Sequence, residues 1–308
     1  MSGDILICAG SGSKDHIGKV AFVFEDLEHT FGGFMGVVRT KGELEPRFLF
    51  HLLTGGSFLA YLGSALSTTT INNLNTGVMR GFRVPVPPLE VQREIVRILD
   101  TFSALEAELE AELEARKQQY EHYREQLLAP SETAEFKLLV DVVRIKNGKD
   151  HKHLDVGEIP VYGSGGIMRF VDSSSAQGPS VLIPRKGSLG NLFYVEGPFW
   201  NVDTIFSTEI DTSLIEPKFL FHQLSIMKLG EMNQAGGVPS QTQGVLNRLR
   251  LSVPPLNEQR RIVAILDKFD ALVNDLSIGL PAELAARRQQ YEYYRDKLLT
   301  FKELEAAA

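Results

Sequence analysis

A glycine-containing stretch from Arg185 to Asn191 carries the side chains best suited to bind another molecule. It reads Arg185-Lys186-Gly187-Ser188-Leu189-Gly190-Asn191, and so offers two cations, a hydroxyl and an amide. Such side chains commonly bind phosphates and base edges in DNA complexes, and glycine lets the backbone approach a phosphate. The sequence therefore predicts DNA contacts from Arg185, Lys186, Ser188 and Asn191, although an ordinary surface loop could have this composition.

Further polar positions extend this prediction along the chain. Residues 144–153 hold four Lys and Arg against one acidic residue, inside a region, 134–255, with twelve residues of each charge. This basic patch is expected to bind phosphates. The added predicted DNA contacts are Lys146, Lys149 and Lys152 in the patch, Ser164 in a glycine-rich turn, Gln241, Gln243 and Asn247 in a later loop, and Lys14, Lys19 and Asn72 as first-half equivalents.

The sequence contains no convincing catalytic pattern. The run Ile17–Val20 resembles a phosphate loop only superficially, because Gly12 lies one residue too far away and Val20 replaces the hydroxyl that would hold magnesium. The glycines at 163–166 lack dinucleotide-binding spacing and predict a tight turn. The histidines and acids within 150–155 have no second cluster to complete a metal site, so a polar loop is favoured. We expect a non-catalytic chain that holds no metal or cofactor itself.

Composition predicts a folded cytoplasmic protein. The chain has 308 residues, enough for about two domains, with 43% hydrophobic and 23% charged residues. No apolar run approaches the roughly 20 residues of a membrane span, and no basic flank indicates a signal peptide. Cys8 is the single cysteine, which suits a reducing compartment and a buried apolar role. The net charge of −7 argues against nucleic acid, but residues 90–128 alone hold ten acids and five bases.

A long repeat determines how these residues are positioned. The first copy reads Val84-Pro-Val-Pro-Pro-Leu89, then Gln92-Arg-Glu-Ile-Val96, and ends Gln118-Gln-Tyr-Glu-His-Tyr-Arg124; the second reads Val253-Pro-Pro-Leu256, then Gln259-Arg-Arg-Ile-Val263, and ends Gln289-Gln-Tyr-Glu-Tyr-Tyr-Arg295. The offset is 167 residues at Leu89 and 171 from Tyr120 onward, so the second copy has four extra residues near Ser277–Pro281. A repeat of this length indicates a duplicated architecture.

Each copy contains a mixed region followed by a helix. Residues 90–128 repeat apolar side chains every three or four positions without Gly or Pro, which predicts one helix of about 55 Å. The second copy repeats the stripe, and Pro281 is expected to interrupt it near Gly279. The helices should pack antiparallel about a pseudo-two-fold axis. Glu45-Pro46 predicts a helix start before 47–53. Strands are predicted at 4–7, 19–23, 138–140, 159–162, 181–183, 192–195 and 204–207.

The duplicated Pro-Pro-Leu and Gln-Arg-Ile-Val junctions, with the Gln-Gln-Tyr-Glu endings, resemble the DNA-specificity subunits of type I restriction–modification systems. The runs Gly3–Ile7 and Ile17–Ala21 are similar to that family's target-recognition domains. The resemblance implies an α+β fold with two target-recognition domains, the first one shortened, separated by a long antiparallel two-helix coiled coil. It divides the chain into 1–89 (first domain), 90–130 (spacer helix), 131–255 (second domain) and 256–303 (spacer helix).

The resemblance also implies a function and partners. Each target-recognition domain would read one half of a bipartite site in double-stranded DNA, and the helix pair would set the gap between half-sites. Two methylation subunits and a restriction subunit would dock on the chain and carry S-adenosylmethionine, ATP and magnesium. Expected partner contacts are Pro88, Gln92, Arg93, Pro255, Gln259, Arg260, Tyr120 and Tyr291.

One departure from the family pattern leaves alternatives open. The first copy has no counterpart to about residues 134–177, so it is expected to start part-way into its domain. That domain would be truncated, completed by another polypeptide, or reduced. The alternatives are a structural scaffold that reads a single half-site and a restriction–modification polypeptide with its own methyltransferase or nuclease activity.

Overall fold

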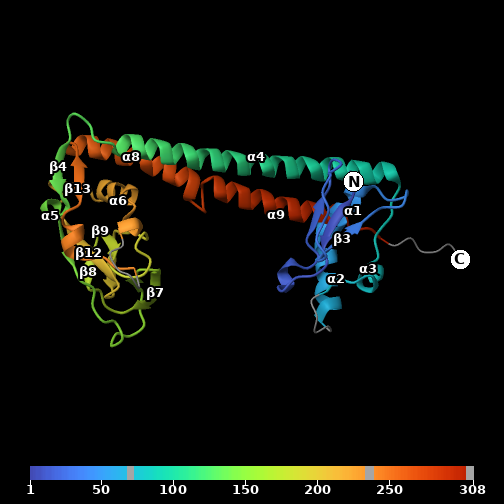
Figure 1. The fold of residues 1–308 in the computed structure, drawn as a ribbon, viewed down its shortest axis with the longest axis horizontal. Helices are drawn as coiled ribbons and strands as arrows, with labels where there is room; N and C mark the ends of the chain where they lie inside the picture. The colour runs from blue at the N-terminus through green and yellow to red at the C-terminus, as the bar shows by residue number, and fades with distance from the viewer. Residues whose placement is uncertain (68–72, 233–238, 303–308) are drawn as a thin grey trace. The chain divides into compact units, whose positions relative to one another are not determined.

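The computed structural model describes residues 1–67, 73–232 and 239–302, and these divide into two compact units (Figure 1). Unit 1 contains Met1–Glu114 and Asp275–Ala308, and unit 2 contains Ala115–Asn274. Each unit therefore combines residues of both sequence copies. The four-part division expected from the sequence instead follows the chain order, and it stays a prediction.

Unit 1 is built on a small antiparallel sheet in the order β2-β1-β3. Its strands are β1 (Ile5–Cys8), β2 (Val20–Phe22) and β3 (Met35–Val38), with a 3₁₀ helix, η1 (Lys14–His16), between the first two. Three helices follow: α1 (Pro46–Thr54), α2 (Gly56–Ser67) and α3 (Thr76–Gly81). The predicted strands at 4–7 and 19–23 are confirmed, whereas β3 carried no clear sequence signal.

The start of α1 follows from its sequence. Pro46 occupies the first turn, where a missing N–H costs nothing, and the Glu45 carboxylate accepts a hydrogen bond from the Phe48 N–H at 2.6 Å. This cap confirms the helix predicted from Glu45-Pro46. It also directs Phe48 and Leu52 into the core, where they are almost fully buried.

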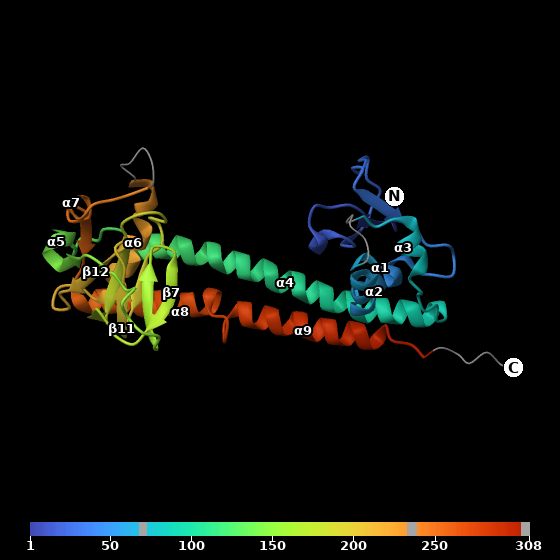
Figure 2. The same ribbon diagram turned by 90° about the horizontal axis from the view of Figure 1, so that it is seen from below.

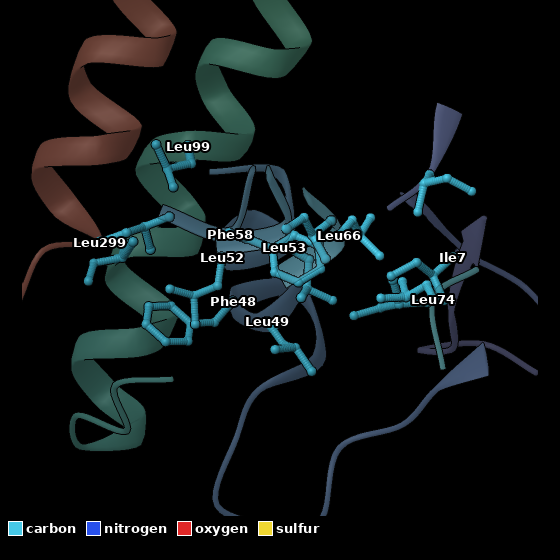
Figure 3. Close-up of a cluster of buried hydrophobic side chains, with 14 residues drawn as sticks. Ile7, Phe48, Leu49, Leu52, Leu53, Phe58, Leu66, Leu74, Leu99 and Leu299 are labelled. Carbon is cyan, nitrogen blue, oxygen red and sulfur yellow. The ribbon is translucent and has the colours of Figure 1, made fainter. Parts of the chain in front are cut away.

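The core of unit 1 includes residues from both copies. Phe48, Leu52 and Phe58 of α1 and α2 pack with Leu99 of the first long helix and with Leu299 near the end of the chain (Figure 3). Truncation of such a buried phenylalanine typically costs about 3–5 kcal/mol. The globular part of each unit is called its lobe below. The lobe of unit 1 therefore depends on side chains from helices that are distant in sequence.

The described residues of unit 2 form three sheets. Their orders are β10-β9-β12-β5, β7-β6-β11-β8 and β13-β4, and every pairing is antiparallel except β11 with β6. The strands are β4 (Glu135–Leu138), β5 (Val143–Lys146), β6 (Ile159–Gly163), β7 (Gly166–Val171), β8 (Ala176–Gln177), β9 (Ser180–Pro184), β10 (Phe193–Val195), β11 (Pro198–Asn201), β12 (Ile205–Ile210) and β13 (Arg250–Val253). The short helices are α5 (Leu139–Val142), α6 (Pro217–Ile226), η2 (Leu229–Met232) and α7 (Gln243–Leu246).

Most predicted strands of this unit are confirmed, and one is wrong. Residues 138–140 were predicted as a strand, but the chain leaves β4 at Leu138 and forms a single helical turn, α5. The Asp141 carboxylate accepts a hydrogen bond from the Leu138 N–H at 2.8 Å, which stabilises that turn. This local contact outweighs the strand preference of the apolar run.

The long helices match the sequence prediction closely. Helix α4 covers Leu89–Leu128 without a break, and the second copy forms α8 (Leu256–Asn274) and α9 (Leu280–Leu298). Gly279 is the N-cap of α9, with Pro281 in its first turn, so the predicted interruption is confirmed. Within unit 1, α4 runs beside α9, and within unit 2 it runs beside α8 (Figures 1 and 2).

The same aromatic contact occurs in both units. In unit 1, Phe102 of α4 stacks on Tyr294 of α9, with ring centroids 5.6 Å apart. In unit 2, Phe269 of α8 stacks on Tyr123 of α4 at 5.7 Å. Phe102 and Phe269 are equivalent in the repeat, as are Tyr294 and Tyr123. The matching contacts confirm the α+β fold class, with an antiparallel helix pair in each unit and a pseudo-two-fold repeat.

The described residues show neither a membrane-spanning helix nor a metal-binding group. No single helix is long and apolar enough to span a membrane, although the bent pair α1 and α2 passes the same test jointly. Within the described ranges, no three His, Cys, Asp or Glu side chains come together as a metal-binding group.

Candidate nucleic-acid interface

Several predicted DNA contacts lie at one end of the β10-β9-β12-β5 sheet of unit 2. Strands β9 and β5 both pair antiparallel with β12, so they run parallel to each other. Their last residues, Pro184 and Lys146, lie opposite Ile205 and Ser207, near the start of β12. The loop 185–191 and the part of the basic patch that follows β5, residues 147–153, therefore leave the sheet at the same end.

Backbone hydrogen bonds hold the first part of the 185–191 loop. The N–H groups of Arg185 and Lys186 both donate to the Thr204 carbonyl, at 2.8 and 3.2 Å. Gly187 has φ of +82°, a left-handed conformation that favours glycine, and its N–H donates to the Pro239 carbonyl at 2.9 Å. The turn thereby projects Lys186 and Ser188 as exposed side chains from a fixed backbone.

Ser164 joins this loop from another sheet. The Asn191 side-chain amide donates to the Ser164 carbonyl at 3.2 Å, and the Ser164 N–H donates to the Thr204 hydroxyl at 3.3 Å. Five of the predicted DNA contacts thus come together on one surface. We call this surface the 185-loop cluster; it consists of Ser164, Arg185, Lys186, Ser188 and Asn191. Sequence reasoning missed Thr204, which organises it, because no charge or motif marks that position.

Gln241 requires a correction. Its side chain is 1% exposed, and its amide nitrogen donates to the Pro184 carbonyl at 2.5 Å. Its own N–H donates to the Arg185 carbonyl at 3.0 Å. A side chain enclosed in this way cannot reach a base edge, so Gln241 supports the 185-loop cluster from behind.

The basic patch lies beside a cavity of about 520 Å³, lined in part by Lys146, Lys149 and Asn201. Lys146 pairs with Glu209 at 3.1 Å, while Lys149 and Lys152 are exposed. The Gln243 amide donates to the Asn147 side chain at 3.2 Å, which ties the later loop to this patch. Asn247 is half-buried and ends α7, where its carbonyl accepts from the Val140 N–H at 3.4 Å.

Unit 1 repeats the backbone framework without the two adjacent cations. The Leu74 N–H donates to the Ala9 carbonyl at 2.7 Å, as Gln241 does to Arg185, and Gly10 bridges Asn73 as Lys186 bridges Ser240. Ala9 and Gly10 thus occupy the places of Arg185 and Lys186. Lys19 is exposed, with its ammonium 3.0 Å from the His16 ring. The backbone of Lys14 lies in η1, and Asn72 lies outside the described residues.

Gln92 and Gln259, both predicted partner contacts, are instead fully buried at 0% exposure. Gln92 accepts from the Glu45 N–H at 2.8 Å and donates to the Glu43 and Pro87 carbonyls at 3.0 and 2.7 Å. Gln259 repeats the set: it accepts from Glu216 at 2.7 Å and donates to Leu214 and Pro254 at 3.1 and 2.7 Å. These glutamines tie each lobe to its long helix, and neither side chain is available to a partner.

The other predicted partner contacts divide into two groups. Pro88, Arg93, Pro255 and Arg260 are exposed, so their docking role stays a prediction. Tyr120 is buried against Phe269, and Tyr291 packs against Phe102 at the equivalent place. The two tyrosines therefore contribute to the contact between the two long helices of each unit, which we call the helix seam.

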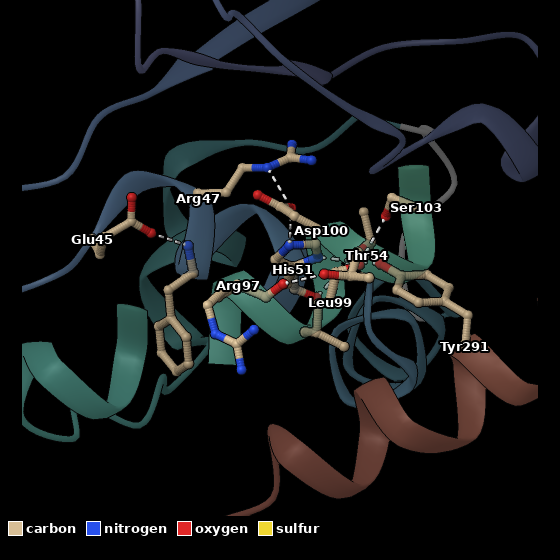
Figure 4. Close-up of polar contacts among 11 residues, drawn as sticks. Glu45, Arg47, His51, Thr54, Arg97, Leu99, Asp100, Ser103 and Tyr291 are labelled. Carbon is tan, nitrogen blue, oxygen red and sulfur yellow. Dashed lines mark hydrogen bonds and ion pairs between the residues drawn. The ribbon is translucent and has the colours of Figure 1, made fainter. Parts of the chain in front are cut away.

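A buried histidine also links lobe to helices in unit 1. His51 of α1 contacts the Asp100 carboxylate of α4 at 2.9 Å and the Tyr291 hydroxyl of α9 at 3.1 Å, and Arg47 donates to the same carboxylate at 2.9 Å (Figure 4). Burial lowers the pKa of His51 to about 4, against the raising effect of Asp100. Burial likewise lowers the pKa of the equivalent His222 to about 4. The Phe-Leu-Phe-His run, repeated at 48–51 and 219–222, is the sequence signal for this contact, but its pattern predicts only a helix.

Comparison with known proteins identifies the relatives. A family model described as the type I restriction modification DNA specificity domain matches residues 2–115 and 131–286. A putative type I restriction enzyme specificity subunit of Haemophilus influenzae is 33% identical over 292 residues, covering 86% of this chain and 74% of that protein. A putative type I specificity subunit of Mycoplasma pneumoniae is 32% identical over 238 residues, covering 71% of this chain and 93% of that protein.

Solved structures share the fold. The S subunit of a type I restriction-modification system from M. genitalium superposes with a TM-score of 0.65 at 19% identity, covering 98% of this chain and 84% of that one. The HsdS subunit from Thermoanaerobacter tengcongensis gives a TM-score of 0.55 at 21% identity, covering 97% and 81%. At these identities the likeness shows a common architecture.

Proposed function

This chain belongs to the family of type I restriction–modification DNA specificity subunits, and from that premise we propose that unit 2 reads one half of a bipartite DNA site. The 185-loop cluster supplies the base and phosphate contacts. The flanking basic patch supplies further phosphate contacts through Lys149 and Lys152.

The observation that carries this proposal is the convergence of polar loops at one end of a rigid sheet. Three segments distant in sequence, around Ser164, 185–191 and 239–243, are held together by hydrogen bonds to backbone groups. Base reading requires side chains held in a fixed register, and a loop anchored on Thr204 meets that need.

The chemistry of methylation and cleavage is proposed to belong to partners. Two methylation subunits would dock beside the exposed junction residues Arg93 and Arg260 and bring S-adenosylmethionine. A restriction subunit would bring ATP hydrolysis and magnesium. The chain itself would act without a cofactor, in the cytoplasm, as the part of the complex that chooses the DNA sequence.

The test uses the complex with its methylation subunits. The double variant Arg185→Ala, Lys186→Ala should lower methylation of the preferred site at least tenfold, because phosphate and base contacts are lost together. It should also reduce the salt dependence of DNA binding by about one to two counterions. Lys268→Ala is the matched control, since it removes an exposed cation on α8, away from the cluster. Unchanged methylation of every site would refute the assignment.

A second candidate is a subunit that reads only one half-site, with unit 1 acting as a scaffold. The replacement of Arg185 and Lys186 by Ala9 and Gly10 in the unit 1 framework favours it. Mapping methylated bases in DNA exposed to the complex separates the two. Two specified half-sites would support reading by both units, and one would support the scaffold.

A further inference from the structure

Unit 1 has an unpaired segment, outside any strand, at the place where unit 2 has a paired strand. In unit 2, β13 pairs with β4 along Arg250–Val253. The repeat places residues 83–86 at the equivalent position, directly before the Pro-Pro-Leu junction. Val86 is 53% exposed, whereas its counterpart Val253 is 5% exposed. Among the described residues, no hydrogen bond involves the backbone of Val84 or Val86.

The free edge has the correct polarity for another strand. In unit 2, the Leu139 N–H donates to the Leu249 carbonyl at 2.8 Å, and the register continues through Leu251 opposite Lys137. Alternation along an antiparallel pair means that Leu251 and Val253 present their backbone groups to β4, while Ser252 faces away. Pro85 stands at the place of Ser252, so its missing N–H costs no bond at this edge.

A second edge of unit 1 is open in the same way. In unit 2, β12 lies between β9 and β5, whereas its counterpart β3 is the outermost strand of the order β2-β1-β3. The elements that cover both edges in unit 2 are β4, α5 and β5, which form one continuous segment, Glu135–Lys146. A single segment of this kind would therefore complete both edges of unit 1.

The surface beside the first edge is a groove lined largely by apolar groups. It measures about 990 Å³ and is lined by Leu52, Phe82, Val84, Val86, Leu299 and Phe301, among others. The cavity at the corresponding junction of unit 2, beside Leu128 and Pro254, measures about 220 Å³. In unit 2, the segment anchors itself through Leu139 and Val142 of α5, which are 0% and 1% exposed.

We propose that unit 1 binds, by strand addition, a peptide segment with the chemistry of Glu135–Lys146. The segment consists of a short strand, one helical turn with two apolar anchors, and a second strand. Main-chain hydrogen bonds to Val84 and Val86 supply affinity, and the anchors supply specificity. An aromatic residue in the first strand would meet Arg83, as Phe136 meets the equivalent Arg250 at 4.9 Å. This partner surface is independent of which bases the chain reads.

The test measures binding of a labelled synthetic peptide with the sequence of residues 132–147 to the full chain, by fluorescence anisotropy. Saturable binding is expected, and a peptide with Leu139→Asp should bind at least tenfold more weakly. Val86→Asp in the chain should weaken binding by a similar factor, because it places a charge beside the groove. Val91→Asp is the matched control, since Val91 is 42% exposed on α4 and is not among the groove-lining residues.

Other results would overturn the proposal. Binding that is absent, or equal for Val86→Asp and Val91→Asp, would contradict strand addition at this edge. A chain ending at Lys302 that binds the peptide far more tightly would assign the edge to the chain's own end. Self-association that the peptide abolishes would assign it to a second copy. Val84→Pro, which removes one donor and adds no charge, guards against a folding defect in Val86→Asp and should also weaken binding.

Discussion

The buried glutamine at each junction supports a quantitative prediction for unit 2. Gln259→Ala removes one hydrogen bond accepted from Glu216 and two donated to the Leu214 and Pro254 carbonyls. A net hydrogen bond contributes about 1 kcal/mol, and buried partners left unpaired add to the loss. The free energy of unfolding of unit 2 should therefore fall by about 3–5 kcal/mol.

The assay is urea unfolding followed by tryptophan fluorescence. Trp200 is the single tryptophan of the chain, it lies in unit 2, and its indole N–H donates to the Lys149 carbonyl at 3.1 Å. With a slope of about 2 kcal/mol per molar urea, the midpoint should fall by about 1.5–2.5 M. Gln177→Ala, at an exposed position of the same unit, should leave the midpoint unchanged.

Gln259→Glu distinguishes hydrogen bonding from simple packing. The carboxylate keeps the size of the side chain but places an acceptor against the two carbonyl oxygens that the amide satisfies. It should destabilise unit 2 at least as much as alanine does at neutral pH. A loss below about 0.5 kcal/mol for either variant would refute the view that this side chain holds lobe to helix.

Two further outcomes are expected. Burial lowers the folded-state pKa of His51 and His222 to about 4, below the ordinary 6.5. Their contribution to the free energy of unfolding should therefore be fully present above pH 6.5 and be lost as the pH falls toward 4. The double variant His51→Asn, His222→Asn should flatten this pH dependence of the urea midpoint between pH 7 and 4, and an unchanged slope would contradict the assignment. Deleting residues 276–279, between α8 and α9, shortens the second helical arm by up to about 6 Å. Mapped methylation sites should then show a gap shorter by close to two base pairs. An unchanged gap would contradict the expectation that the helix pair sets the distance between half-sites.

The sequence predicted the regular parts of the fold well because periodicity and capping determine them. The stripe from Ile95 to Leu127 gave α4 almost to the residue, and Pro281 correctly marked the break before α9. The turn α5 was missed because a single carboxylate, Asp141, decides it against an apolar run. Strand β3 was missed because Met35–Val38 has no alternating pattern.

The sequence predicted which loops form the candidate site, but it did not predict which of their side chains are buried. Arg185, Lys186, Ser188 and Asn191 meet as a cluster with Ser164, as their composition indicated. Gln241 has the same chemistry as a DNA-reading residue, yet it is enclosed behind Pro184. Gln92 and Gln259 also have the chemistry of surface contacts, yet both are fully buried. A side chain's type shows which bonds it can make, whereas the tertiary fold decides whether those bonds lie inside the chain.

The mixed ancestry of each helix seam bears on how this architecture arose. In unit 1, Phe102 comes from the first copy and Tyr294 from the second, and in unit 2 the roles are exchanged between Tyr123 and Phe269. A molecule with one copy alone would have a lobe and half of each seam. Such a single copy could complete both contacts only by pairing with a second molecule. Because both copies lie in one chain, each pair of stacked rings forms within the molecule and does not depend on protein concentration.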